Sequence, residues 1–102
     1  MPARIDMNEY LCLRTLSKTL QEDDLRTLPL EQYYSLLEMN EHFFKNTLQN
    51  MQKKDLVAIG FDRRGLILRI ANWAENFSIS ASKLKNFSIT LTREGRKQLE
   101  GW

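Results

Sequence analysis

The sequence predicts an α+β domain built from three helices, a β-hairpin and a short C-terminal helix. Two observations carry this prediction. Apolar residues recur at helical spacing up to about residue 54, and from Leu56 onward they form short β-prone runs separated by a turn. The length of 102 residues suffices for one hydrophobic core and leaves no room for a second module. The whole chain, residues 1–102, is therefore predicted to be a single domain.

The first predicted helix extends from about residue 7 to about residue 20. Asp6 and Glu9 have the spacing of a capping box, which satisfies free N–H groups at the start of a helix. The apolar stripe of this helix follows at spacings of three and four and consists of Tyr10, Leu13, Leu16 and Leu20. Residues 21–24 are all polar and end the helix, and the remainder of 21–29 is expected to be a loop or a short turn.

Two further helices are predicted between residues 29 and 54. Pro29 suits the first turn of a helix, where its missing N–H costs nothing, and Asn40 suits the N-cap of the next helix. The apolar stripe of the first of these helices consists of Leu30, Tyr33, Tyr34 and Leu37, and that of the second consists of Phe44, Leu48 and Met51. The second helix is expected to end near Lys53 and Lys54, because positive charges stabilise the C-terminal end of a helix.

The C-terminal half is predicted to be mainly β-structure, with a wing over about 56–91. Strands are expected over 56–61, 66–70 and 87–91, with a turn over 62–65. Residues 72–86 are ambiguous. A strand over 76–80 is preferred, and the alternative is a helix whose apolar face contains Ile67, Ile70, Ala74 and Phe77. Thr92 is a suitable cap for a terminal helix over about 92–101.

Composition argues against several classes of protein. No apolar run approaches the roughly 18–20 residues that cross a bilayer, and the N-terminus lacks a secretory signal, so a cytoplasmic protein without membrane contact is expected. Cys12 is the single cysteine and is expected to be a buried apolar residue. His42 is the single histidine and is expected at the surface or at a helix cap. No metal, no cofactor and no small-molecule ligand are expected. The sequence contains neither a nucleophile–base set nor a glycine-rich phosphate loop, so an enzyme is not expected either.

Charge is distributed unevenly along the chain. Residues 1–40 contain four Lys and Arg against seven Asp and Glu, whereas residues 41–102 contain eleven against six. A basic C-terminal half is what contact with a polyanion on one side of the protein requires. Chance patterning of a solvated surface is the alternative explanation.

Two segments resemble winged helix-turn-helix regulators. The apolar positions Leu30, Tyr33, Leu37 and Met39, the cap Asn40, the second stripe and the strand start Leu56-Val57 follow the helix-turn-helix pattern. Residues 89–100 resemble the Leu-Thr-x-x-Gly-Arg-x-x-Leu-Glu ending of MarR-type and PadR-type proteins. Glu38 and Asp55 stand where glycine is frequent in that pattern. The resemblance implies a transcriptional regulator that binds double-stranded DNA as a homodimer, with an interface formed by the first helix and the C-terminal helix ending at Trp102.

The resemblance places the third helix in the major groove of DNA, as in other helix-turn-helix proteins. The face opposite Phe44, Leu48 and Met51 provides the candidate DNA-binding residues His42, Lys45, Asn46, Gln49, Asn50 and Lys53. Arg63 and Arg64, in the predicted hairpin turn, are candidates for contacts with the DNA backbone or minor groove. Lys83 and Lys85 are a second candidate pair for the wing tip.

Two other functions remain open from the sequence. Winged helices also serve as protein–protein interaction modules, which the acidic N-terminal half and Glu41 would suit. The same fold also serves as an accessory DNA-binding protein in phage or plasmid replication. Salt-dependent binding to duplex DNA distinguishes the DNA-binding functions from the interaction module.

Overall fold

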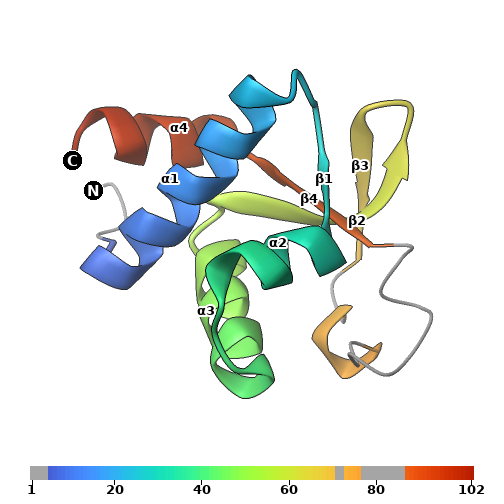
Figure 1. The fold of residues 1–102 in the computed structure, drawn as a ribbon, viewed down its shortest axis with the longest axis horizontal. Helices are drawn as coiled ribbons and strands as arrows, with labels where there is room; N and C mark the ends of the chain where they lie inside the picture. The colour runs from blue at the N-terminus through green and yellow to red at the C-terminus, as the bar shows by residue number, and fades with distance from the viewer. Residues whose placement is uncertain (1–4, 71–72, 77–86) are drawn as a thin grey trace.

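The computed structural model describes residues 5–70, 73–76 and 87–102 (Figure 1). This part of the chain has the predicted α+β class, with four α-helices, one 3-10 helix and a four-stranded antiparallel sheet. In chain order the elements are α1 (Met7–Glu22), β1 (Leu28–Pro29), α2 (Leu30–Leu37), α3 (Glu41–Lys53), β2 (Val57–Arg63), β3 (Leu66–Arg69), η1 (Trp73–Asn76), β4 (Ser88–Leu91) and α4 (Arg93–Glu100).

The sheet is organised around β2, and its strand order is β1-β4-β2-β3. The first half of β2 pairs with β4, from Val57 opposite Leu91 to Gly60 opposite Ser88. Its second half pairs with β3, and here Gly60 lies opposite Arg69. A Cβ atom at Gly60 would overlap the backbone carbonyl of Leu68, so only glycine allows strands on both sides of β2 at this position.

One hydrophobic core fills the space between the helices and the sheet. The hydroxyl of Tyr33 lies in this core and donates a 2.6 Å hydrogen bond to the carbonyl oxygen of Cys12, which satisfies the buried phenol. The largest fully buried side chains are Trp73, Tyr33, Phe44, Leu13, Leu16, Leu28, Leu30, Leu48, Met51, Leu56, Ile59 and Ile89. Helices α1, α2 and α3 therefore pack the apolar stripes that the periodicity of the sequence predicts against this core, with Tyr10, Tyr34 and Leu37 only partly buried.

One prediction about local structure is wrong, and another is contradicted at its first residue. The preferred strand over 76–80 would begin at Asn76, but Asn76 ends the 3-10 helix η1. The rest of that strand, and Phe77 of the helical alternative, lie outside the described residues. The segment 21–29 is not entirely loop, because Leu28 and Pro29 form β1 and pair with Ile89 and Ser88. A two-residue strand is too short to produce a periodic signal, and it exists only through its pairing with β4.

The turns at the two ends of α3 use left-handed backbone conformations. Glu38, between α2 and α3, has φ 52°, and Asp55, between α3 and β2, has φ 59°. These are the two positions where the helix-turn-helix pattern frequently has glycine. A residue with a Cβ atom is strained in this region by roughly 1 kcal/mol, whereas glycine adopts it freely.

Glu38→Gly is therefore expected to stabilise the protein by roughly 0.5–1 kcal/mol. The side chain of Glu38 is exposed, so the substitution removes no buried contact. Urea denaturation followed by circular dichroism measures the change. Gln32→Gly, at an exposed position inside α2, is the matched control and is expected to destabilise by roughly 0.5–1 kcal/mol. Destabilisation by both substitutions would contradict a strained turn at Glu38.

Candidate nucleic-acid interface

Helix α3 has one buried face and one exposed face. The helix starts where the side chain of Asn40 accepts a 2.8 Å hydrogen bond from the backbone N–H of Phe43, as the predicted N-cap requires. Its buried residues are Phe44, Thr47, Leu48 and Met51. Hydrophobic burial on this side of the helix determines which side chains face solvent on the other.

The six candidate residues on α3 all lie away from its buried stripe. Five of them are exposed, namely His42, Asn46, Gln49, Asn50 and Lys53. Lys45 is half-buried, and its ammonium group lies 3.9 Å from the carboxylate of Glu41. The structure thus groups these residues on one helix surface, with carboxamide groups at its centre and Lys53 at the C-terminal end.

The side chains of this surface include both hydrogen-bonding and apolar groups. A ring nitrogen of His42 and the amide nitrogen of Asn46 are 3.2 Å apart, which orders the first turn of the surface. Phe43 is 46% exposed and borders the polar residues, since Asn46 and Asn50 follow it at spacings of three and seven. Helical periodicity places Phe43 at the edge of the face that contains Phe44, which leaves open whether it packs on the first helix or on a partner.

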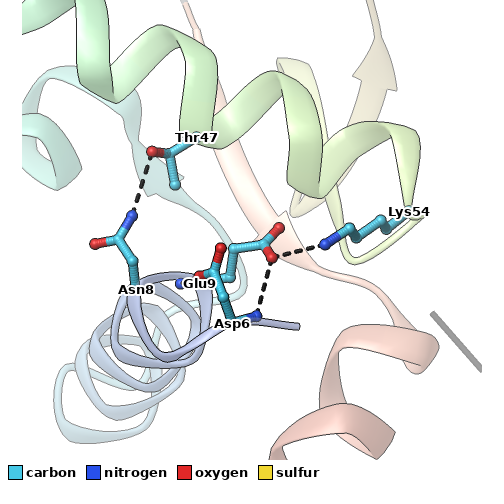
Figure 2. Close-up of polar contacts among 5 residues, drawn as sticks. All are labelled: Asp6, Asn8, Glu9, Thr47 and Lys54. Carbon is cyan, nitrogen blue, oxygen red and sulfur yellow. Dashed lines mark hydrogen bonds and ion pairs between the residues drawn. The ribbon is translucent and has the colours of Figure 1, made fainter. Parts of the chain in front are cut away.

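Lys54 faces inward, whereas the preceding Lys53 is exposed (Figure 2). The ammonium group of Lys54 lies 2.7 Å from the carboxylate oxygen Oε1 of Glu9, whose side chain is only 5% exposed. The same oxygen accepts a 3.1 Å hydrogen bond from the backbone N–H of Asp6, which completes the predicted capping box. Within the part of the chain that the structure describes, Glu9 Oε2 is buried without a hydrogen-bond partner. The negative charge of this buried carboxylate is therefore balanced by the ammonium group of Lys54.

A second polar contact joins the same two helices (Figure 2). The side-chain amide of Asn8 donates a 3.4 Å hydrogen bond to the hydroxyl of Thr47, which is itself buried. We call these two interactions the α1–α3 contact. It consists of Asn8 and Glu9 on α1, Thr47 on α3, and Lys54 at the end of α3. It attaches the middle and the C-terminal end of α3 to the start of α1, and so determines the orientation of the exposed face of α3.

The other predicted residues lie at the end of the β2–β3 hairpin, where Arg63 is the last residue of β2 and Arg64 is in the turn. Arg64 and Gly65 have φ values of 56° and 88°, which are typical of a two-residue type I′ hairpin turn. Asp62 supports the turn by accepting hydrogen bonds from the Thr27 hydroxyl at 2.7 Å and from the Gly65 N–H at 2.8 Å. The hydrogen bond from Thr27, followed by that from Gly65, lowers the pKa of Asp62, so this carboxylate stays charged at neutral pH.

Arg63 and Arg64 do not share a surface with α3. In Figure 1 the β2–β3 hairpin points away from α3, and its turn lies beside the connection from α1 to β1. Arg26, from that connection, approaches the turn instead, since a Cβ atom at Gly65 would lie 2.6 Å from its Cδ atom. An open hollow of about 430 Å³ borders this region and is lined by Arg26, Arg64, Asp24 and Asp62, among others. Lys83 and Lys85, the alternative pair for the wing tip, lie outside the described residues.

Cys12 is almost completely buried, as predicted. Burial is the main cause that raises the pKa of its thiol to about 11, and the negative charges of Asp6 and Glu9 add to the effect. The thiol is therefore protonated at neutral pH and is a poor nucleophile. Among the described residues, no group of three or more His, Cys, Asp or Glu side chains is arranged to hold a metal ion.

Comparisons with known proteins give no match. No family model, no curated protein and no solved structure is similar to this chain. Within residues 5–70, 73–76 and 87–102, no helix is both long enough and apolar enough to span a membrane.

Proposed function

We propose that this chain is a winged-helix protein that binds double-stranded DNA through the exposed face of α3. The observation that carries the proposal is the exposed group of hydrogen-bonding side chains on α3, with Lys53 at its end. The order of the elements from α1 to β2, followed by two further strands and α4, is compatible with a winged-helix layout. In that layout α3 is the recognition helix.

The chemistry of the α3 face suits the major groove. An Asn or Gln carboxamide can accept from N6 and donate to N7 of adenine, so Asn46, Gln49 and Asn50 favour A·T-containing sites. Phe43 can contact a thymine methyl group, and Lys53 can reach a phosphate or a guanine edge. The α1–α3 contact fixes this face before DNA binds, which reduces the entropy lost on association.

Double-stranded DNA with two half-sites suits a two-fold dimer. An apolar surface formed by α1 and the residues after α4 supports this part of the proposal. Met7 and Leu11 are 59% and 48% exposed and lie one turn apart on α1. Next to them the ring of Tyr10 stacks on Trp102 with 4.7 Å between the centroids, and Trp102 is half-exposed. Large apolar side chains grouped in this way are typical of protein interfaces. We propose that a second copy of the chain covers them.

Titration of a labelled random-sequence duplex at several salt concentrations tests DNA binding. Affinity is expected to fall with salt with a log–log slope of about −0.9 for each phosphate contacted. The Lys45→Ala/Lys53→Ala variant is expected to bind more weakly, with a slope that is less steep by about 1–2 units. The matched control is Arg14→Ala/Lys18→Ala, which removes the same charge from exposed positions on α1. Equal slopes in both variants, or no binding of the wild type at low salt, would refute the proposal.

The proposed role of the DNA binding is transcriptional regulation, which requires preference for a particular sequence. Selection from a pool of random duplexes is expected to enrich a site with A·T pairs in two symmetric halves, because carboxamides dominate the α3 face. Enrichment of no sequence, together with tight salt-dependent binding, would instead support the accessory role in replication.

A further inference from the structure

Strand β3 lies at the edge of the sheet and has an exposed apolar surface. Among the described strands it pairs only with β2. Leu66 is 72% exposed and Leu68 is 52% exposed, and Phe61 on the neighbouring strand is 40% exposed. Proteins usually protect an edge strand with charged residues, proline or a bulge, because an unprotected edge pairs with other chains. The sequence of β3, Leu66-Ile67-Leu68-Arg69, contains only one of these features, the charge of Arg69.

The exposed apolar residues share one face of the hairpin. Phe61 lies opposite Leu68, and Arg63 lies opposite Leu66. Because side chains alternate along a strand, these four residues project to the same side. The ring of Phe61 also packs on buried Phe87, with 5.6 Å between the centroids. We call Phe61, Leu66 and Leu68 the apolar hairpin face. It is anchored to the core at Phe61 and open at the two leucines.

The free edge of β3 presents backbone groups with a defined register. The N–H of Ile70 donates a 3.0 Å hydrogen bond to the carbonyl oxygen of Ile59, so this pair is hydrogen-bonded. Hydrogen-bonded pairs alternate along an antiparallel ladder, so Leu68 and Leu66 also point their backbone groups toward β2. The N–H and C=O groups of Ile67 and Arg69 therefore point toward the open edge, where an added strand would bond.

Positive charge is concentrated at the turn end of this edge. Arg63, at the end of β2, and Arg64, in the turn, are both exposed, and Arg26 packs against Gly65 beside them. Within the described residues none of these three guanidinium groups has an ion-pair partner within 4 Å. The four ion pairs there are Lys18–Glu22, Lys45–Glu41, Lys54–Glu9 and Arg69–Asp55. Asp62 is already engaged by Thr27 and Gly65. The turn therefore favours a ligand that carries negative charge.

We propose that β3 binds an extended segment of a partner protein that pairs with its free edge. Apolar side chains of the segment would cover Leu66 and Leu68, and acidic side chains beyond them would reach Arg26, Arg63 and Arg64. Backbone hydrogen bonds supply affinity in this mode of recognition, and the side chains supply specificity. The turn at the end of this edge points away from α3 in Figure 1, so a segment bound along β3 leaves the exposed face of α3 free. The proposal does not depend on DNA binding.

A peptide titration without DNA tests the proposal on the full chain. The probe is a ten-residue peptide with six alternating Val and Thr residues followed by four Glu residues. When the free peptide concentration is about ten times the dissociation constant, amide hydrogen exchange of Ile67 and Arg69 is expected to slow about tenfold. The reason is that these amides then exchange only after the peptide dissociates. Amides of α3 are expected to be unchanged. The same peptide with four Lys residues in place of Glu is expected to bind at least about tenfold more weakly.

Two variants separate the apolar and the charged contributions. Leu66→Ser/Leu68→Ser changes exposed side chains only and is expected to keep the fold and weaken the peptide about tenfold or more. Arg63→Glu/Arg64→Glu is expected to reverse the preference, so that the Lys peptide binds better than the Glu peptide. Equal binding of both peptides to the wild type would overturn the proposal, as would protection outside β3. Protection of Ile67 and Arg69 that rises with protein concentration in the absence of peptide would overturn it in favour of pairing between two copies of this chain.

Discussion

Gly95→Ala is expected to lower the free energy of unfolding by about 2–3 kcal/mol, although alanine is the better helix former. Gly95 is buried in the first turn of α4. A Cβ atom there would overlap the backbone carbonyl of Leu56 and would lie 3.1 Å from a methyl carbon of Leu91. Neither the start of β2 nor the helix backbone can move freely, because the N–H of Thr92 donates to the carbonyl oxygen of Leu56 at 3.1 Å.

Gly101→Ala provides the matched control for this prediction. Gly101 follows the last turn of α4 in a right-handed helical conformation, and a Cβ atom there would meet only the carbonyl oxygen of Lys97 at an ordinary 3.4 Å. This substitution is expected to change the stability by less than about 0.5 kcal/mol. Urea denaturation of both variants measures the difference. A Gly95→Ala protein as stable as Gly101→Ala would contradict close docking of α4 on β2.

Lys54→Met is expected to lower the free energy of unfolding by about 2 kcal/mol. The substitution preserves most of the aliphatic side chain and, among the described residues, leaves the buried carboxylate of Glu9 with the N–H of Asp6 as its remaining polar partner. Loss of one partner from a fully buried ion pair costs about 3–5 kcal/mol, and the value is reduced here because the Lys54 side chain is about one-third exposed. For a domain of this size the melting temperature would fall by about 8–15 °C.

Two further variants identify the buried charge as the cause. Lys53→Met removes the neighbouring exposed charge and is expected to change stability by less than about 0.5 kcal/mol. Glu9→Gln/Lys54→Met removes both charges and is expected to be more stable than Lys54→Met alone, because no uncompensated carboxylate remains. A double variant less stable than Lys54→Met would show that the ion pair is not the source of the effect.

Local signals in the sequence predict the elements that depend on local interactions. The helices are found from apolar periodicity, and their starts are found from Asp6, Asn40 and Thr92, whose side chains all accept the expected capping hydrogen bonds. Glu38 and Asp55 stand at positions where the helix-turn-helix pattern frequently has glycine. Both adopt the left-handed conformation that glycine would have there. The glycine of the Leu-Thr-x-x-Gly-Arg ending has a physical explanation, since Gly95 lets α4 approach the carbonyl of Leu56.

Contacts between distant residues could not be predicted in the same way. Glu9 is identified from sequence only as part of a capping box, and its ion pair with Lys54, 45 residues away, depends on the packing of α1 against α3. A turn is predicted over 62–65, and the structure has it at Arg64 and Gly65, because Asp62 and Arg63 still pair with β3. The pairing of β3 with β2 is the predicted hairpin, but the direction of this hairpin relative to α3 depends on how the strands are arranged in the sheet, for which the sequence has no signal. The turn lies apart from α3 in Figure 1, and contact of both with the same DNA stays a prediction.

The most direct test of DNA binding by α3 is a titration of the isotopically labelled protein with a duplex, followed by the chemical shifts of its backbone amides. Binding through α3 is expected to shift the amides of His42, Asn46, Gln49 and Lys53 most strongly. Amides of Ile67 and Arg69 on the edge of β3 are expected to shift little. Shifts confined to the β2–β3 turn and Arg26, or no shifts at low salt, would contradict the assignment of α3 as the recognition helix.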